Sequence, residues 1–180
     1  MGNPFRVVLV CLTLAAATEV SAQQAVVYSV DGWPRMGTRA DGKLEAEYFQ
    51  FGVQQSAPTG PGAPAGRVNV QDGVLEVPIG APVFQFMRAA LLGERMKSVL
   101  IEFPMVKEGG KGPAPFAARL SEVVVTGVRL SKSGFVGGSG YAAVSLQAQK
   151  IEVFSAVQDP SGKVGPVNRF GYDVRAGKTF

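Results

Sequence analysis

The chain has 180 residues, of which 46% are hydrophobic, a net charge of +4 and no histidine. Without histidine, the sequence excludes the Ser-His-Asp and Cys-His catalytic arrangements and every histidine-ligated metal site. The nearest thing to a basic cluster is Arg169, Arg175 and Lys178. It lacks the interleaved aromatic residues of a nucleic-acid site, so we interpret it as a solvated face and expect no nucleic-acid partner.

The first 22 residues have the three parts of a secretory signal peptide. Arg6 provides a basic start, residues 7–17 form an unbroken apolar run, and Val20-Ser21-Ala22 provides small residues before a cleavage point. A retained membrane anchor is the alternative, but the run is shorter than the ~20 residues that a spanning helix needs. We therefore expect no stable membrane anchor and a secreted or periplasmic protein. The predicted division is a signal peptide over residues 1–22 and one folded domain over residues 23–180.

Strand patterns fill the first part of this domain. An apolar run over residues 25–30 ends at the turn pair Asp31-Gly32. Residues 45–53 alternate in polarity, with Phe49, Phe51 and Val53 on one face, which predicts a strand half buried in a core.

The next apolar stretch changes phase at Asp72-Gly73. Val68 and Val70 lie in one phase, whereas Leu75 and Val77 lie in the other. Either a hairpin turn or a bulge of one extra residue explains this change.

Three further strands are predicted in the second half, with glycine-rich connections between them. In the last of them, Val144 and Leu146 share a face, whereas Ile151 and Val153 lie in the other phase. We therefore place a second bulge at Gln149-Lys150. The three predicted strands cover residues 97–103, 120–130 and 142–154.

One helix is predicted between Pro82, in its first turn, and Gly93, just past its end. Only Gln85 and Arg88 are polar between these two residues, so the helix is apolar nearly all round and must be buried nearly all round. It is buried either wholly within one subunit, or by a barrel opening on one side and a partner on the other. The candidate contact residues on the second interpretation are Phe84, Met87 and Leu91.

A long loop over residues 54–66 carries Pro58, Pro61 and Pro64 at every third position, interleaved with glycine. This composition favours an extended, partly polyproline conformation that cannot pack a core. The three prolines are candidate contacts to another subunit if the loop docks. A loop that is only solvated is the other interpretation.

No motif in the chain supports catalysis or a cofactor. Residues 109–112 lack the spacing of a phosphate-binding loop, and no Ser or Thr follows Lys111. The Asp-Gly pairs lack the spacing of a calcium loop and are typical of turns. We therefore predict a protein that is not an enzyme and holds no cofactor or metal.

The end of the chain resembles the last strands of the Hcp family, which forms the inner tube of the bacterial type VI secretion system. The resemblance is clearest in residues 147–154 (QAQKIEVF) and 171–180 (GYDVRAGKTF). Residues 27–32, 49–53 and 66–72 resemble the opening strands of the family in the same order. In the family the third of these continues as one long strand, which favours the bulge at Asp72.

The resemblance implies a mainly β fold: a two-sheet antiparallel β-barrel with one buried α-helix, Hcp-like and phage tail-tube-like. It also implies a self-assembled homohexameric ring that stacks into a tube, carries small effectors in its lumen and meets spike or sheath proteins. The long loop would reach the neighbouring ring. Family resemblance alone implies assembly in the cytoplasm followed by secretion. The leader favours an alternative, an exported Hcp-like ring or binding module that acts outside the cytoplasm without a tube. An unrelated exported β-barrel enzyme is the third hypothesis.

Overall fold

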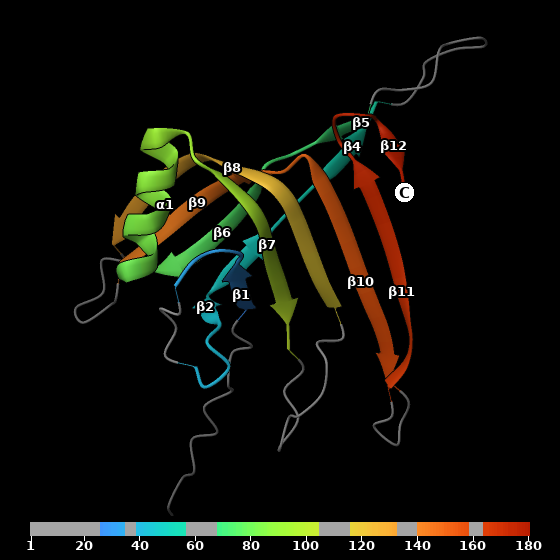
Figure 1. The fold of residues 1–180 in the computed structure, drawn as a ribbon, viewed down its shortest axis with the longest axis horizontal. Coiled ribbons are helices and arrows are strands. Elements are labelled where there is room, and N and C mark those ends of the chain that lie inside the picture. Colours follow the sequence, from blue (N-terminus) through green and yellow to red (C-terminus); the bar gives the residue numbers. More distant parts are fainter. Residues whose placement is uncertain (1–25, 35–38, 57–67, 105–115, 133–139, 159–163) are drawn as a thin grey trace, which may run out of the picture.

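The computed structural model describes residues 26–34, 39–56, 68–104, 116–132, 140–158 and 164–180 (Figure 1). Within these ranges there are one helix and twelve strands, and the pairings between the strands are antiparallel. The elements are β1 (Val26–Val30), β2 (Leu44–Ala46), β3 (Tyr48–Gln50), β4 (Val53–Gln55), β5 (Val68–Val70), β6 (Gly73–Pro78), α1 (Ala81–Leu92), β7 (Arg95–Phe103), β8 (Phe116–Lys132), β9 (Gly140–Gln147), β10 (Lys150–Gln158), β11 (Val164–Asp173) and β12 (Lys178–Thr179).

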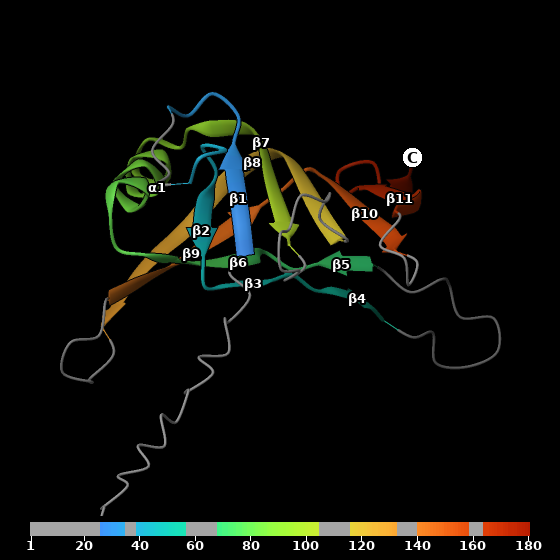
Figure 2. The same cartoon turned by 90° about the horizontal axis from the view of Figure 1, so that it is seen from below.

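The long strand β8 belongs to both layers of the fold. Its first half pairs with β7 on one side and β10 on the other, and its second half pairs with β9. One layer runs β2-β1-β7-β8-β10-β11-β12, and the other runs β3-β6-β9-β8. The chain passes from β2 to β3 between the layers, where the Glu47 amide donates to the Glu76 carbonyl at 2.9 Å. The layers therefore close into a barrel (Figure 2), and the predicted mainly β fold with one helix is confirmed.

Pairs that are distant in sequence close this barrel. Val27 in β1 lies opposite Glu102 in β7, and Gly73 in β6 lies opposite Leu146 in β9. The buried core between the layers includes Leu75, Val99 and Val144, none of which is exposed. Strands β10, β11 and β12 extend one layer beyond the barrel (Figure 1).

The bulge predicted at Asp72 is confirmed. Gln50 lies opposite Val74, and Val53 lies opposite Val70. Val74 is four positions from Val70, whereas Val53 is three positions from Gln50, so β5 and β6 together carry one extra residue. The Gln71 amide donates to the Gly52 carbonyl at 2.9 Å across this point. An extra residue reverses which face each side chain takes, which explains the change of phase.

The predicted strand over residues 45–53 is broken into β2, β3 and β4, because its partner changes from β1 to β6 and then to β5. Phe49 and Phe51 are half-buried, as the alternation predicts, but Val53 is exposed. The ribbon β4–β5 runs out past the barrel, where no layer covers Val53 (Figure 2).

The second bulge, predicted at Gln149-Lys150, is wrong. Gln147 lies opposite Val124 and Lys150 opposite Ser121, so three positions separate the pairs on both strands and neither strand has an extra residue. The change of face occurs in β8 at the same level, where Glu122 has a φ of 52°. The single predicted strand is therefore β9 and β10. Its register against β8 shifts elsewhere, between Val125 and Gly127.

The helix boundaries agree with the prediction. Pro82 lies in the first turn of α1, and Gly93 ends the helix at a φ of 64°, a left-handed conformation that favours glycine. Val83, Phe86 and Ala89 are buried on one face, and the Phe86 ring packs 4.7 Å from Trp33 and 6.1 Å from Tyr28. Within the described ranges, no helix is long and apolar enough to cross a membrane.

Candidate subunit interface

The outward face of α1 carries exposed apolar side chains. Phe84 is 70% exposed, Leu91 82% and Leu92 65%, and Met87 is half-buried beside them. We call Phe84, Met87, Leu91 and Leu92 the helix patch. Full burial of the helix within one subunit is excluded, because one face covers the barrel and the other is open. Within one subunit the helix is thus buried on one side only, which leaves the second interpretation, in which a partner covers the other side.

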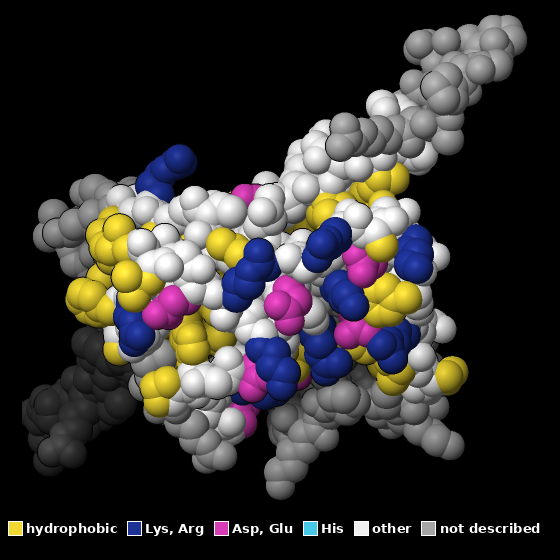
Figure 3. Space-filling model, turned by 45° about the horizontal axis from the view of Figure 1, so that its top comes forward, with side chains coloured by type: hydrophobic (Ala, Val, Ile, Leu, Met, Phe, Trp, Pro, Cys, Tyr) yellow, Lys and Arg dark blue, Asp and Glu magenta, His cyan; other side chains and the backbone are white. Residues whose placement is uncertain are grey.

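Figure 3 shows hydrophobic side chains gathered at the end of the molecule that carries α1. Ile79 and Leu130 lie at the same end and are about half exposed. The Arg88 guanidinium donates to a carboxylate oxygen of Glu94 at 3.0 Å beside this surface. The apolar surface therefore extends from the helix patch to Ile79 and Leu130. Within the described residues, the only ion pair on α1 lies at the edge of this surface.

A second group of apolar side chains lies at the opposite end, where the layer extends beyond the barrel. Val153 lies opposite both Ala118 and Phe170, and Phe116 lies opposite Ser155, so Phe116, Val153 and Phe170 share one face. Phe116 is 41% exposed and Phe170 58%, with Val153 half-buried between them. We call these three residues the strand patch.

The strand patch is in contact with the core of the barrel. The Phe116 ring meets Phe103 edge-on at 5.3 Å, and Phe103 lies 6.3 Å from Phe49. Along β10, Ile151 is buried inside the barrel, whereas Val153 on the same face is only half-buried. Burial decreases along this face because β3, β6 and β9 do not extend beneath it.

The other face of these strands carries charged groups around one buried carboxylate. Glu152 is 7% exposed, accepts a hydrogen bond from Arg169 and lies 3.6 Å from Arg119. Both guanidinium groups also lie over the Phe154 ring, at 5.3 Å for Arg119 and 5.8 Å for Arg169. Figure 3 shows the resulting alternation of basic and acidic side chains. The single carboxylate of Glu152 pairs with a guanidinium group from each neighbouring strand, so this cluster links β8, β10 and β11.

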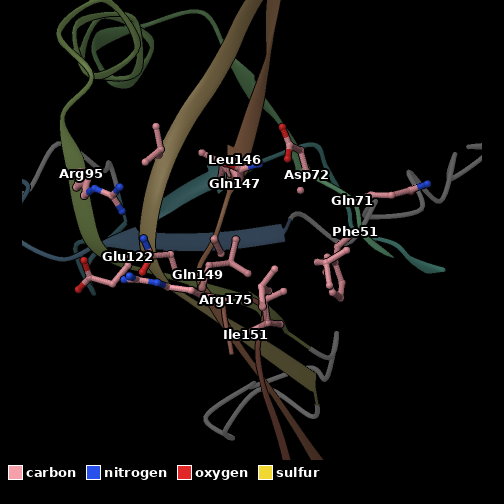
Figure 4. A pocket seen from close by; sticks show the side chains of 16 residues that line it. Phe51, Gln71, Asp72, Arg95, Glu122, Leu146, Gln147, Gln149, Ile151 and Arg175 are labelled. Carbon is pink, nitrogen blue, oxygen red and sulfur yellow. The ribbon is translucent and has the colours of Figure 1, made fainter. Parts of the chain in front are cut away.

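A cavity of about 290 Å³ lies where β8, β9 and β10 meet (Figure 4). Arg95 and Glu122 lie on one side of it, and Asp72 and Phe51 on the other. Asp72 accepts a hydrogen bond from Thr126 at 2.6 Å. Among the described residues, no group of three or more His, Cys, Asp or Glu side chains could hold a metal ion. The cavity therefore has apolar walls and a charged rim.

One buried polar atom of the core is unsatisfied within the described part of the chain. The Tyr28 hydroxyl has no hydrogen-bond partner there, and the side chain has no exposed surface. Burial raises the pKa of the Tyr28 phenol well above its ordinary value of 10.0, because the charged form would lose its hydration.

The structure separates the contact residues predicted from the sequence. Phe84, Met87 and Leu91 lie together in the helix patch. Pro58, Pro61 and Pro64 lie outside the described residues, so their role stays a prediction. The strand patch was not predicted, because the predicted strand begins at Leu120 and excludes Phe116, and near the end of the chain only the basic cluster of Arg169, Arg175 and Lys178 was considered as a surface. The alternation of Phe170, Tyr172 and Val174 was the available signal.

Comparisons with known proteins agree on one family. Residues 36–154 match the family model described as "Type VI secretion system effector, Hcp". No curated protein sequence matches significantly. A solved structure described as a type six secretion system protein is similar with a TM-score of 0.77 at 15% identity, over 87% of this chain and 99% of that one.

Two further structures give the same result. Hcp1 from Salmonella typhimurium is similar with a TM-score of 0.69 at 15% identity, over 87% of this chain and 98% of its own. A type VI secretion system effector from Yersinia pestis is similar with a TM-score of 0.62 at 16% identity, over 83% and 99%. At such identities the likeness shows a shared fold.

Proposed function

The chain belongs to the Hcp family of type VI secretion system proteins, whose members are non-enzymatic and form hexameric rings, and from this we propose that it is one subunit of a homohexameric ring. The proposal extends to stacking of rings into a tube that carries small effectors in its lumen and meets spike or sheath proteins. The expectation of a non-enzymatic protein agrees with the family.

The observation that carries the ring proposal is the helix patch. Phe84 and Leu91 are seven positions apart, so they lie on the same face of α1, two turns from each other. A subunit that leaves such a face open exposes an apolar surface of the kind that marks a partner. Heterologous contacts between identical subunits close into rings when their rotation permits.

Light scattering on residues 23–180 tests this proposal. We expect six times the subunit mass, and a monomer at tens of micromolar would overturn the ring and the tube together. Leu91→Asp should give a folded subunit that no longer assembles, with folding checked by circular dichroism. Tyr48→Asp is the matched control, because Tyr48 is an exposed apolar residue on β3, outside the helix patch. Assembly should survive that change, and a loss there equal to that of Leu91→Asp would contradict the assignment.

We propose that the loop with Pro58, Pro61 and Pro64 contacts a neighbouring ring. Replacing residues 57–67 by a short Gly-Ser turn keeps β4 and β5, and shortening a surface loop costs little closure entropy. The thermal transition of the subunit should therefore change little, while sedimentation should show fewer stacked rings. A subunit that unfolds after this replacement would show that the loop is structural.

The leader supports a second candidate function, an exported ring or binding module that works without a secretion tube. Residues 1–22 have the composition of a signal peptide, so we propose cleavage after Ala22. Intact-mass measurement from the producing cell should then give Gln23 as the first residue. Met1 retained on the cytoplasmic protein would remove this candidate and favour the tube. Release into the medium that needs the secretion sheath would also favour the tube.

A further inference from the structure

The exposed apolar side chains of the described residues concentrate at two opposite ends of the molecule. The helix patch lies at one end, and the strand patch lies at the other, beyond the barrel (Figure 1). Ile79 and Leu130 lie beside the helix patch, and Val167 lies on the other face of β11 from Phe170. The other large exposed apolar residues lie apart from both patches: Tyr48, Val53 and Val68 on β3, β4 and β5, and Phe180 after β12. The subunit therefore has two separate apolar surfaces, one helical and one on a sheet.

Each of the two surfaces lacks a layer of secondary structure that would cover it. A helix with a second apolar face needs another layer to cover that face, and a sheet face needs a helix or another sheet. On α1, Phe84 and Leu91 span about 10 Å along the helix axis. Phe116 and Phe170 lie on strands separated only by β10, which places them two strand spacings, or about 10 Å, apart across the sheet. The patches therefore match in size.

A ring imposes a further condition on these surfaces. When identical subunits close into a ring of six, each contact is heterologous, so every subunit must present two different surfaces that fit each other. Pairing of one helix patch with another would give a two-fold dimer instead. Because the patches differ in kind and lie at opposite ends, they meet this condition.

Resting on the ring proposed above, we infer that the helix patch of one subunit packs on the strand patch of the next copy of this chain. Phe84 and Leu91 then cover Phe116 and Phe170 of the neighbour, and α1 completes the layer missing beneath β10 and β11. The helix thus contributes to two cores, its own through Phe86 and the neighbour's through Leu91.

Cysteine crosslinking tests this pairing, because Cys11 is the only cysteine and residues 23–180 contain none. The variant with both Leu91→Cys and Phe170→Cys is treated with a flexible bis-maleimide and separated on a denaturing gel. We expect a ladder that ends at six subunits. Each single variant alone should stay uncrosslinked, whereas a mixture of the two, unfolded and reassembled together, should stop at dimers. Leu91→Cys with Val53→Cys is the matched control, because Val53 is exposed outside both patches, and it should give no ladder.

Light scattering on the same samples separates this inference from the ring itself. A sixfold mass without a ladder would overturn the pairing and leave the ring proposal intact. A monomeric mass would overturn the ring proposal. Crosslinked dimers from Leu91→Cys alone would show pairing of two helix patches and would overturn the inference, as would a ladder of equal yield from the Val53 control.

Discussion

Replacing Phe86 or Phe84 by alanine compares the two faces of α1 within one helix. Phe86 has no exposed surface and packs against Trp33 and Tyr28, whereas Phe84 is 70% exposed. Phe86→Ala should lower the free energy of unfolding of the subunit by about 3–5 kcal/mol, since it removes a buried ring and leaves a cavity. For a domain of this size that corresponds to a melting temperature lower by on the order of 10 °C.

Phe84→Ala should change the stability of the isolated subunit by less than about 0.5 kcal/mol, because its ring is already largely in water. Urea unfolding at several protein concentrations measures both effects. The loss from Phe86→Ala should be independent of concentration, whereas any loss from Phe84→Ala should grow as assembly becomes favoured. Equal losses from both variants in dilute monomer would refute the two-faced helix. That result would place the Phe84 ring in the core of its own subunit.

Three other substitutions test individual groups. Tyr28→Phe should leave stability unchanged or raise it by about 1 kcal/mol, because it removes a buried hydroxyl without a partner in the described structure. Because burial raises the pKa of Tyr28, the unfolded chain loses the phenol proton at a lower pH than the folded chain. Stability should therefore fall as the pH rises above the ordinary pKa of 10.0. Calorimetry should show a smaller fall in Tyr28→Phe. Gly93→Ala should cost about 1 kcal/mol in thermal unfolding, since φ is 64° there, whereas Gly127→Ala, where an added Cβ meets nothing closer than 3.8 Å, should cost much less. Glu152→Gln should lower the free energy of unfolding in urea by about 2 kcal/mol, because two guanidinium groups lose a shielded carboxylate. The control Glu45→Gln, at an exposed carboxylate, should cost less than about 0.5 kcal/mol. A cost from Glu152→Gln as small as that of the control would show that the cluster contributes nothing to stability.

Local chemistry made several features predictable from the sequence. Pro82 and Gly93 act through their own backbone preferences, so both ends of α1 could be placed without tertiary information. The bulge at Asp72 was also predictable, because an extra residue reverses the alternation on either side of it. The same signal misled the prediction at Gln149-Lys150, since it does not distinguish an extra residue on one strand from an irregularity that both strands share.

The second half of the candidate interface depends on tertiary structure. Phe116 and Phe170 have the alternation of ordinary half-buried strand residues, and nothing near them in sequence indicates whether a second layer covers them. Their exposure follows from the position of the second layer, because β9 pairs with the other half of β8, and β6 and β3 follow β9 away from β10 and β11. The helix patch was easier to predict, because a helix with apolar residues on every side has more apolar surface than one barrel can cover.

The order of the strands in the barrel also determines when the chain can fold. The pairings of β1 with β7 and of β6 with β9 join segments that are far apart in sequence. The barrel therefore cannot close until most of the chain has been synthesised. Pairing between such distant segments makes folding slow, in the range of roughly milliseconds to seconds. A precursor that remains open for this time can be threaded through a membrane pore as an extended chain. The topology that closes the barrel is therefore compatible with the leader proposed at residues 1–22, because β1 can pair only with the short strand β2 until β7 has been made, and the barrel cannot close before β9.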